Sequence, residues 1–289
     1  MSYQIFTDAT ADLSEGMLKG LPRLEIIPMQ VTVGEREYTY GPNGDIDVAT
    51  FYRLLREGEF ASTSQINPDT YMQSFEPYLQ QGTDILYLCF SSGLSGTIQS
   101  ARLAIEDLKE LYPQQKVVCV DTLCGSVGQA FLVHEALKQQ RKGLSLQELF
   151  VWVEEHKRNV CHWFTVDTFE HLKHGGRVSS AAAMMGTVLQ IKPMLRINDM
   201  GALEVCAKPR GRKKAVNAQV EKLLKDWQPE LGTTIVVGHG DDPDGAEYLC
   251  NAVKNIFTET EIYVAEIGPI IGAHTGPGML ALIYWGNNR

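Results

Sequence analysis

The 289-residue sequence contains no long uninterrupted apolar run. A membrane-spanning helix needs about 18 or more consecutive apolar residues, and a run such as Ile85–Phe90 is only as long as a strand. The first residues also lack the basic and apolar regions of a secretory signal. We therefore expect a cytoplasmic protein without a membrane span.

Basic residues are in deficit. The chain has 26 Lys and Arg residues against 35 Asp and Glu residues, which gives a formal net charge of -9. A general nucleic-acid binder usually carries an excess of positive charge, so we expect no nucleic-acid partner. The hydrophobic share of 44% is typical of a globular protein, and the length fits two medium-sized domains.

Motifs for common cofactors are missing. The six cysteines are scattered and form no C-x-x-C pair, so we interpret them as buried thiols and not as zinc or redox centres. There is no G-x-x-x-x-G-K-S/T phosphate loop, and Gly238-His239-Gly240 lacks the third glycine of a dinucleotide fingerprint. We expect no cofactor.

The sequence contains weak indications of a metal site and of a serine–histidine catalytic site. His171 and His174 have the spacing of metal ligands on a helix, but no third ligand accompanies them, so an exposed helix face is the better interpretation. Ser95 does not lie in a G-x-S-x-G elbow, and no carboxylate is obviously paired with His274. Acyl or phosphoryl transfer by Ser95 and His274 is retained as the alternative function.

Strands alternate with helices in the first half of the chain. Tyr3–Phe6, Asp84–Phe90 and Lys116–Asp121 have the composition of strands. Helices are predicted over residues 97–111 and up to Leu137. This alternation predicts an α/β domain with a parallel sheet, in which ligands bind beyond the carboxyl ends of the strands.

The second half of the chain has a different order of predicted helices and strands. A β-hairpin is predicted over residues 193–206, followed by a helix over 215–227, a strand over 234–238, a helix over 244–257 and a strand over 261–265. This order indicates an α+β domain with its own sheet. We place the two domains at residues 1–160 and 161–289.

Hydroxyl-rich loops and one histidine are the main candidates for a binding site. Ser62–Gln65 and Ser91–Thr97 both precede a predicted helix, and His274 lies in a glycine-rich segment at residues 268–278. Hydroxyls, helix-start amides and an imidazole can hold a buried carboxylate, which needs several hydrogen-bond donors. They suit a phosphate nearly as well.

Basic residues cluster between residues 196 and 225, where eight basic side chains accompany three acidic ones. Such a patch in an acidic protein fits an anion or an acidic partner surface. A solvated hairpin end and helix start would explain it equally well.

Six motifs in order along the chain resemble the DegV family, the bacterial fatty-acid-binding proteins that act as FakB-type subunits of fatty acid kinase. They are Thr7-Asp8-Ala9-Thr10-Ala11-Asp12-Leu13, Thr63-Ser64-Gln65, Ser91-Ser92-Gly93-Leu94-Ser95-Gly96-Thr97, Gly175-Gly176-Arg177-Val178, Ile191-Lys192-Pro193 and Ala273-His274-Thr275-Gly276-Pro277-Gly278. The resemblance extends over essentially the whole chain.

The resemblance implies a DegV-like two-domain fold that holds one long-chain fatty acid between the domains. The carboxylate would be bound by Thr63, Ser95 and His274, with possible support from Ser64, Ser92 and Gly96. The acyl chain would enter an apolar tunnel in the second domain, for which Ala181–Met185 and Leu189–Ile191 are candidate walls. The protein itself would supply no catalytic residue and no metal.

The resemblance also implies a partner: an ATP-binding kinase subunit, related to dihydroxyacetone kinases, that converts the acid to an acyl phosphate for phospholipid metabolism. Arg177 and Arg210 match family arginines that are associated with this partner and product, and Arg212 could take the place of Arg210. Two departures from the family pattern limit what the resemblance implies. Ile66 follows Thr-Ser-Gln where family members commonly have Pro, which affects the loop beside the carboxylate. Ser179-Ser180 and the Ala-rich run after the Arg177 motif leave the tunnel shape and the preferred acyl-chain length open.

Overall fold

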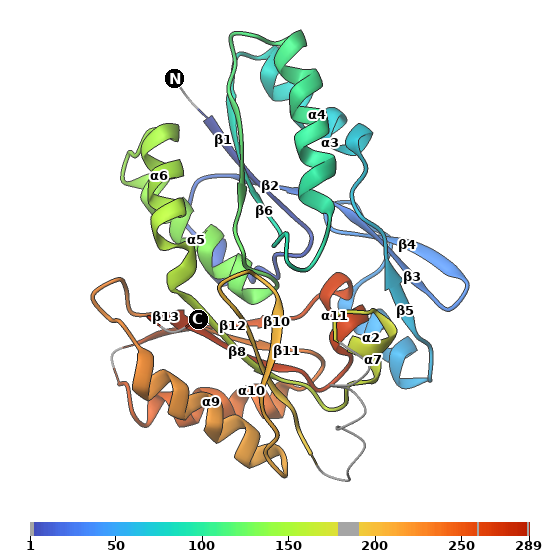
Figure 1. The fold of residues 1–289 in the computed structure, drawn as a ribbon, viewed down its shortest axis with the longest axis vertical. Coiled ribbons are helices and arrows are strands. Elements are labelled where there is room, and N and C mark those ends of the chain that lie inside the picture. Colours follow the sequence, from blue (N-terminus) through green and yellow to red (C-terminus); the bar gives the residue numbers. More distant parts are fainter. Residues whose placement is uncertain (1–2, 179–190, 259, 288) are drawn as a thin grey trace.

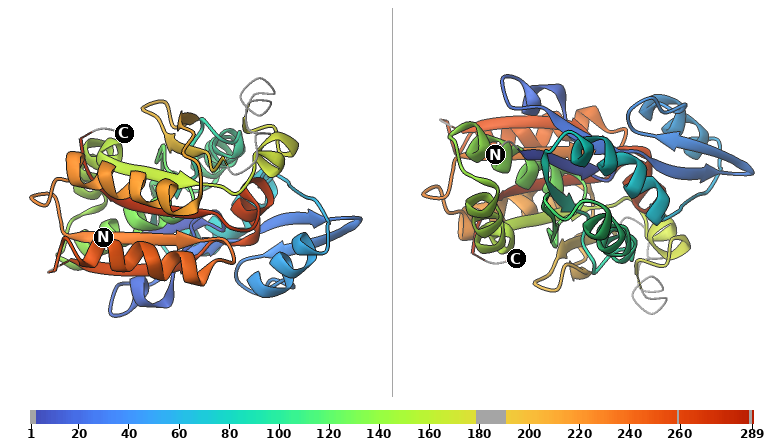
Figure 2. Two further views of the ribbon diagram at one scale, coloured as in Figure 1. Left: turned by 90° about the horizontal axis from the view of Figure 1, so that it is seen from below. Right: turned by 90° about the horizontal axis from the view of Figure 1, so that it is seen from above.

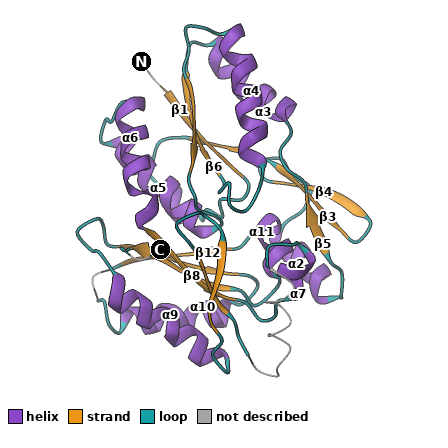
Figure 3. Ribbon diagram, viewed as in Figure 1, coloured by secondary structure: helices purple, strands orange, loops and turns teal. Residues whose placement is uncertain are grey.

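The chain folds around three β-sheets, which Figures 1, 2 and 3 show from different directions. The computed structural model describes residues 3–178, 191–258, 260–287 and 289. The predicted combination of a parallel sheet in the first half and a separate sheet in the second half is confirmed.

Sheet A is the predicted parallel sheet. It consists of β1 (Tyr3–Asp8), β2 (Leu24–Ile27), β6 (Asp84–Cys89) and β7 (Val117–Asp121), in the order β2-β1-β6-β7 with every pair parallel. Alternate residues of β6 belong to different cores. Ile85 and Tyr87 pack in the core that contains α3 (Pro68–Gln80) and α4 (Thr97–Leu111), whereas Leu86 and Leu88 pack in the core that contains α5 (Val127–Arg141).

Sheet C has six strands in the order β10-β9-β8-β13-β11-β12. Its strands are β8 (Val160–Thr165), β9 (Met194–Ile197), β10 (Leu203–Ala207), β11 (Thr234–His239), β12 (Glu261–Glu266) and β13 (Leu280–Trp285). Only β11 and β12 pair in parallel. α9 (Arg212–Asp226) and α10 (Pro243–Lys254) pack on one face, and α5 packs on the other.

The central strand β13 was missed by the sequence analysis, which assigned no element to residues 280–285. All six of its residues are buried. A strand that is buried on both faces has no alternation of apolar and polar residues, so periodicity gives no signal.

Sheet B was also not predicted. It is a small antiparallel sheet of β3 (Met29–Val33), β4 (Arg36–Tyr40) and β5 (Ala61–Thr63), in the order β4-β3-β5. α2 (Val48–Arg56) joins β4 to β5, and α1 (Glu15–Leu18) precedes β2. β5 ends at Thr63, the first residue of the Thr-Ser-Gln motif.

Helix α5 lies between sheets A and C, as Figure 1 shows. Residues 127–137 are all buried, so the helix has no solvent-facing stripe. Gly128 allows the closest approach, because a Cβ atom at this position would lie 1.9 Å from His162 Nε2. α6 (Leu146–His156) follows with a capping box between Ser145 and Glu148. A domain boundary at residue 160 stays a prediction.

The predicted hairpin over residues 193–206 is confirmed as β9 and β10. Its turn reaches the loop after β6, where Ser91 Oγ donates a 2.7 Å hydrogen bond to the carbonyl of Gly201. Gly201 has φ +72°, a left-handed conformation that glycine adopts without a Cβ clash. The hairpin therefore connects sheet C to the polar loops of sheet A.

Among the helices of the described part of the chain, none has the length and apolar character needed to cross a bilayer.

Candidate functional site

One cavity brings the predicted binding loops together. It lies between the carboxyl ends of the sheet A strands, sheet C and the helix α11 (Pro269–Thr275), and holds about 830 Å³ of space free of protein atoms, its mouth included. Most of its walls are apolar, from Met29, Phe90, Leu94, Val127, Phe164, Leu172, Ile197, Leu203, Ile270, Ile271, Met279, Ala281 and Ile283. The polar walls are Thr10, Thr63, Ser64, Gln65, Ser95, Ser126, His162, Arg177, His274 and Thr275.

Thr63 and His274, which are 211 residues apart in sequence, meet in this cavity. Thr63 Oγ1 and His274 Nε2 share a hydrogen bond of 2.8 Å, with the direction set by the imidazole tautomer. Burial, together with the nearby charges of Arg177 and His174, lowers the pKa of His274 to about 4. The imidazole is therefore neutral at pH 7 and acts as a hydrogen-bonding group without a charge.

Two glycines allow His274 to reach this place. A Cβ atom on Gly175, at the end of α7 (Glu170–His174), would lie 2.1 Å from His274 Nδ1. A Cβ atom on Gly276, which has φ +70°, would lie 2.2 Å from His171 Cδ2. The Gly-Gly-Arg and His-Thr-Gly motifs therefore interlock through close packing of backbone against ring. The sequence analysis had no signal for this contact.

The predicted residues of the loops 62–65 and 91–97 differ in whether they line the cavity with Thr63 and His274. Ser95 and Ser64 line the cavity. Ser95 Oγ accepts a 3.2 Å hydrogen bond from the Thr97 amide at the start of α4. Ser92 is not a cavity wall, and its amide donates to Asp121. Gly96 caps α4, and a Cβ atom there would approach the side-chain amide of Gln65 to 2.9 Å.

Arg177 lies at the cavity and is exposed to solvent. Its Nε donates to the carbonyl of Leu94 at 3.3 Å, and its Nη1 donates to the carbonyl of Gly175 at 2.5 Å. The guanidinium thus bonds to the loop after β6 and to the residue that follows α7.

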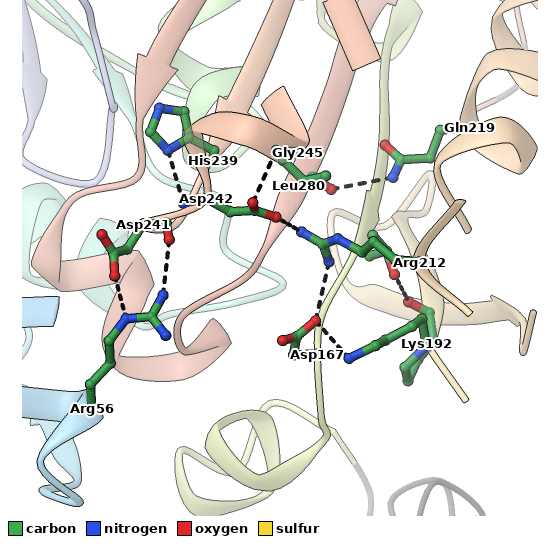
Figure 4. A network of polar contacts seen from close by, with 12 residues as sticks. Arg56, Asp167, Lys192, Arg212, Gln219, His239, Asp241, Asp242, Gly245 and Leu280 are labelled. Atoms are coloured by element: carbon green, nitrogen blue, oxygen red, sulfur yellow. Dashed lines mark hydrogen bonds and ion pairs between the residues drawn. The ribbon is translucent and has the colours of Figure 1, made fainter. Parts of the chain in front are cut away.

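Arg210 and Arg212 have different surroundings, as Figure 4 shows for Arg212. Arg212 is half-buried and forms ion pairs with Asp242 and, at 3.3 Å, with Asp167, which also accepts from Lys192 at 2.8 Å. Arg210 is exposed and has no side-chain hydrogen bond or ion pair within the ranges that the structure covers. Of the two arginines, Arg210 is thus the one without an ion pair to a described residue.

The remaining predicted residues either lie outside the described part of the chain or are placed elsewhere in it. Ala181–Met185 and Leu189 lie outside the described residues. Ile191 is described, but it pairs with Arg210 in an isolated bridge and is not a wall of the cavity. His171 and His174 pack against the ring of Phe60, with centroid distances of 5.3 and 4.7 Å. No group of three metal-binding side chains occurs among the residues that the structure describes.

The geometry needed for Ser95 and His274 to act as a nucleophile and base is incomplete. His274 bonds to Thr63, and its Nδ1 has no hydrogen-bond partner in the described part of the chain. A serine hydrolase needs an acid or carbonyl on that nitrogen to orient the ring. In the described residues, His274 therefore lacks the third group that would orient it as a base for a serine.

Sequence reasoning missed the role of Asp12. Its carboxylate is buried, accepts a 2.8 Å hydrogen bond from the Gly268 amide at the start of α11, and accepts a 2.6 Å hydrogen bond from Ser126 Oγ at the start of α5. Ser126 has φ +55°, a rare conformation for a residue with a side chain. Asp12 thus joins β1 to both helices that flank the cavity. Burial raises its pKa to about 7, although both hydrogen bonds act in the opposite direction.

A comparison with family models matches residues 2–287 to the model described as an uncharacterised protein, DegV family. A DegV domain-containing protein from Clostridium perfringens is 40% identical over 287 residues, which cover 99% of this chain and 98% of the relative. These matches confirm the resemblance found in the motifs.

Solved structures have the same fold. A DegV family protein from Thermus thermophilus, described by its fatty acid binding, superposes with a TM-score of 0.84 at 29% identity and covers 99% of this chain and 100% of its own. The fatty acid kinase B3 protein of Streptococcus pneumoniae, loaded with linoleic acid, superposes with a TM-score of 0.88 at 21% identity over 99% and 100% of the two chains.

The raised pKa of Asp12 predicts a distinct pH dependence of stability. The folded chain keeps a proton on Asp12 that the unfolded chain releases, so this group's contribution to the free energy of unfolding falls as pH rises from about 4 to about 7. Asp12→Asn cannot titrate. We expect the free energy of unfolding of the variant, minus that of wild type, to increase over this range in urea titrations.

Asp47→Asn is the matched control. Asp47 is an exposed helix cap whose pKa is lowered by hydrogen bonds from Thr50, so its titration lies below about pH 4. Its difference from wild type should be flat between about pH 4.5 and about pH 8. A flat difference for Asp12→Asn as well would contradict the pKa assigned to the Asp12 carboxyl.

Proposed function

Because the chain belongs to the DegV family, we propose that it binds one long-chain fatty acid and presents the carboxylate to a separate kinase. The observation that carries the proposal is the hydrogen-bonded pair of Thr63 and His274 at one part of a cavity whose other walls are mostly apolar. A fatty acid has the same division between a polar head and an apolar chain.

The polar part of the cavity provides donors for a carboxylate. With a proton on Nε2, His274 donates to Thr63 Oγ1, and the Thr63 hydroxyl is then free to donate to the bound acid. Ser95 Oγ adds a second hydroxyl, and the guanidinium of Arg177 adds positive charge. Together they offset the cost of removing a carboxylate from water.

The apolar walls of the cavity would supply most of the binding free energy for a fatty acid. Each methylene of an acyl chain that leaves water contributes about 0.8 kcal/mol. The aliphatic and aromatic walls, which come from sheets B and C and from neighbouring helices and loops, offer this environment without a fixed hydrogen-bonding pattern along the chain. The ligand would thus be held mainly by its tail and oriented by its head.

Phosphorylation would be carried out by a partner, because the sequence has no G-x-x-x-x-G-K-S/T loop to bind the phosphates of ATP. The partner would be an ATP-dependent kinase subunit related to dihydroxyacetone kinases. An acyl phosphate has more negative charge than a carboxylate, and the guanidinium groups of Arg177 and Arg210 would stabilise that increase. The protein would then be a binding subunit in a cytoplasmic enzyme of phospholipid metabolism.

Thr63→Val tests the head-group assignment. The substitution keeps the shape of the side chain and removes the hydroxyl, so we expect the Kd for a long-chain fatty acid to rise about 10-fold, the cost of one buried hydrogen bond. Binding is measured by calorimetry on delipidated protein, and native mass spectrometry reports the fatty acid that remains after purification.

Ser62→Ala provides the matched control, because Ser62 is the preceding residue of β5, is exposed, and does not line the cavity. Its Kd should equal that of wild type. Equal affinities for Thr63→Val and wild type would show that Thr63 does not hold the carboxylate.

The variants Arg210→Gln and Arg212→Gln should distinguish a role in folding stability from a role in the kinase reaction. Arg212→Gln leaves Asp167 and Asp242 without their guanidinium and should lower the free energy of unfolding by about 1–3 kcal/mol. Arg210→Gln should leave unfolding unchanged and slow acyl phosphate formation when the kinase subunit and ATP are added. Wild-type rates with Arg210→Gln would remove Arg210 from the proposed reaction.

A further inference from the structure

The register of sheet C places four cavity residues in one row across the strands. Ile283 pairs with His162, and Leu203 pairs with Ile197. β8 and β9 pair antiparallel with Trp163 opposite Arg196. The same register places His162 next to Ile197. All four residues line the cavity. His162 is the polar member of a row that is otherwise aliphatic.

This row lies at the end of the cavity away from His274. β13 starts shortly after α11 and runs away from it, and its cavity residues are Ala281 and then Ile283, about 7 Å further along the strand. The next residue on that face, Trp285, is fully buried and is not a cavity wall. It packs edge-on against Phe131, with a centroid distance of 4.8 Å.

His162 is held rigidly in this row. Its Nδ1 bonds to the carbonyl of Val160 at 2.8 Å, which fixes the ring orientation. The other side of the ring rests on α5, where a Cβ atom on Gly128 would lie 1.9 Å from Nε2. Only 3% of the residue is exposed. The imidazole cannot move away from a ligand unless β8 or α5 also moves.

The charge state of His162 is compatible with an apolar ligand. Burial, with the nearby guanidinium of Arg289, lowers the pKa of His162 well below its usual value. The ring is therefore neutral at physiological pH, and it presents a flat, uncharged surface at the end of the apolar walls.

We propose that His162, fixed between Val160 and Gly128, is the residue that ends the acyl-chain cavity and sets the longest chain that the protein accepts. This inference rests on the proposed function, because it assumes that the cavity binds a fatty acid with its head at Thr63 and His274. It assigns the choice of substrate length to a position on β8, far in sequence from both Thr63 and His274.

The test compares Kd values for a homologous series of saturated straight-chain acids. His162→Ala removes the ring and should move the preferred chain length up by about two carbons, with about 10-fold or larger changes for acids at the upper limit. His162→Leu has a similar volume and should keep the preference of wild type. An unchanged preference in His162→Ala, or the same shift in both variants, would overturn the proposal.

Leu203→Phe covers the case in which His162→Ala does not fold. Leu203 lies in the same row on the edge strand β10 and is only half-buried, so a larger ring is accommodated more easily there. It should fill the end of the cavity and move the preference to shorter chains. An unchanged preference in this variant would also overturn the proposal.

Met29→Ala is a control for cavity size alone. Met29 lines the cavity from β3, in the sheet that carries Thr63, so its truncation should weaken all chain lengths alike without moving the preference. A wild-type protein that binds none of the acids would refute the proposed function itself. Binding without any shift in the His162 variants refutes only the length assignment.

Discussion

The burial of His274 beside Thr63 is the constraint on which the site depends. The neutral imidazole of His274 extends from the seven-residue helix α11 to Thr63, at the end of β5 in sheet B. Gly175 leaves room for the ring, and Asp12 holds the start of α11 in place. Because the ring is removed from water, its pKa falls, and the imidazole can take part in hydrogen bonds without adding a charge of its own.

The cavity joins two kinds of structure with different physical roles. Loops after the parallel strands of sheet A provide hydroxyls and helix-start amides, which suit an anionic head. The antiparallel strands of sheet C provide alternate apolar side chains facing α5, which suit a chain. The hairpin of β9 and β10 connects the two, since its turn is bonded to Ser91. In the proposed function, recognition of the head and of the tail would thereby be separated in space.

The sequence predicted the parallel sheet, the hairpin and the loops that meet at the cavity, because these features have local signals in periodicity and turn residues. It did not predict β13, since a strand buried on both faces has no alternation. It also gave no sign that Asp12 would bond to Gly268, or that His162 would rest on Gly128, because both contacts depend on packing between distant segments. The choice between Arg210 and Arg212 likewise needed the ion pairs of Arg212.

The most direct measurement is a crystal structure of the protein with a bound long-chain fatty acid. We expect one carboxylate oxygen within hydrogen-bond distance of the Thr63 hydroxyl, with the other near Ser95 and the chain running along the inner face of sheet C toward His162. A fatty acid bound in the reverse direction, or outside this cavity, would contradict the account.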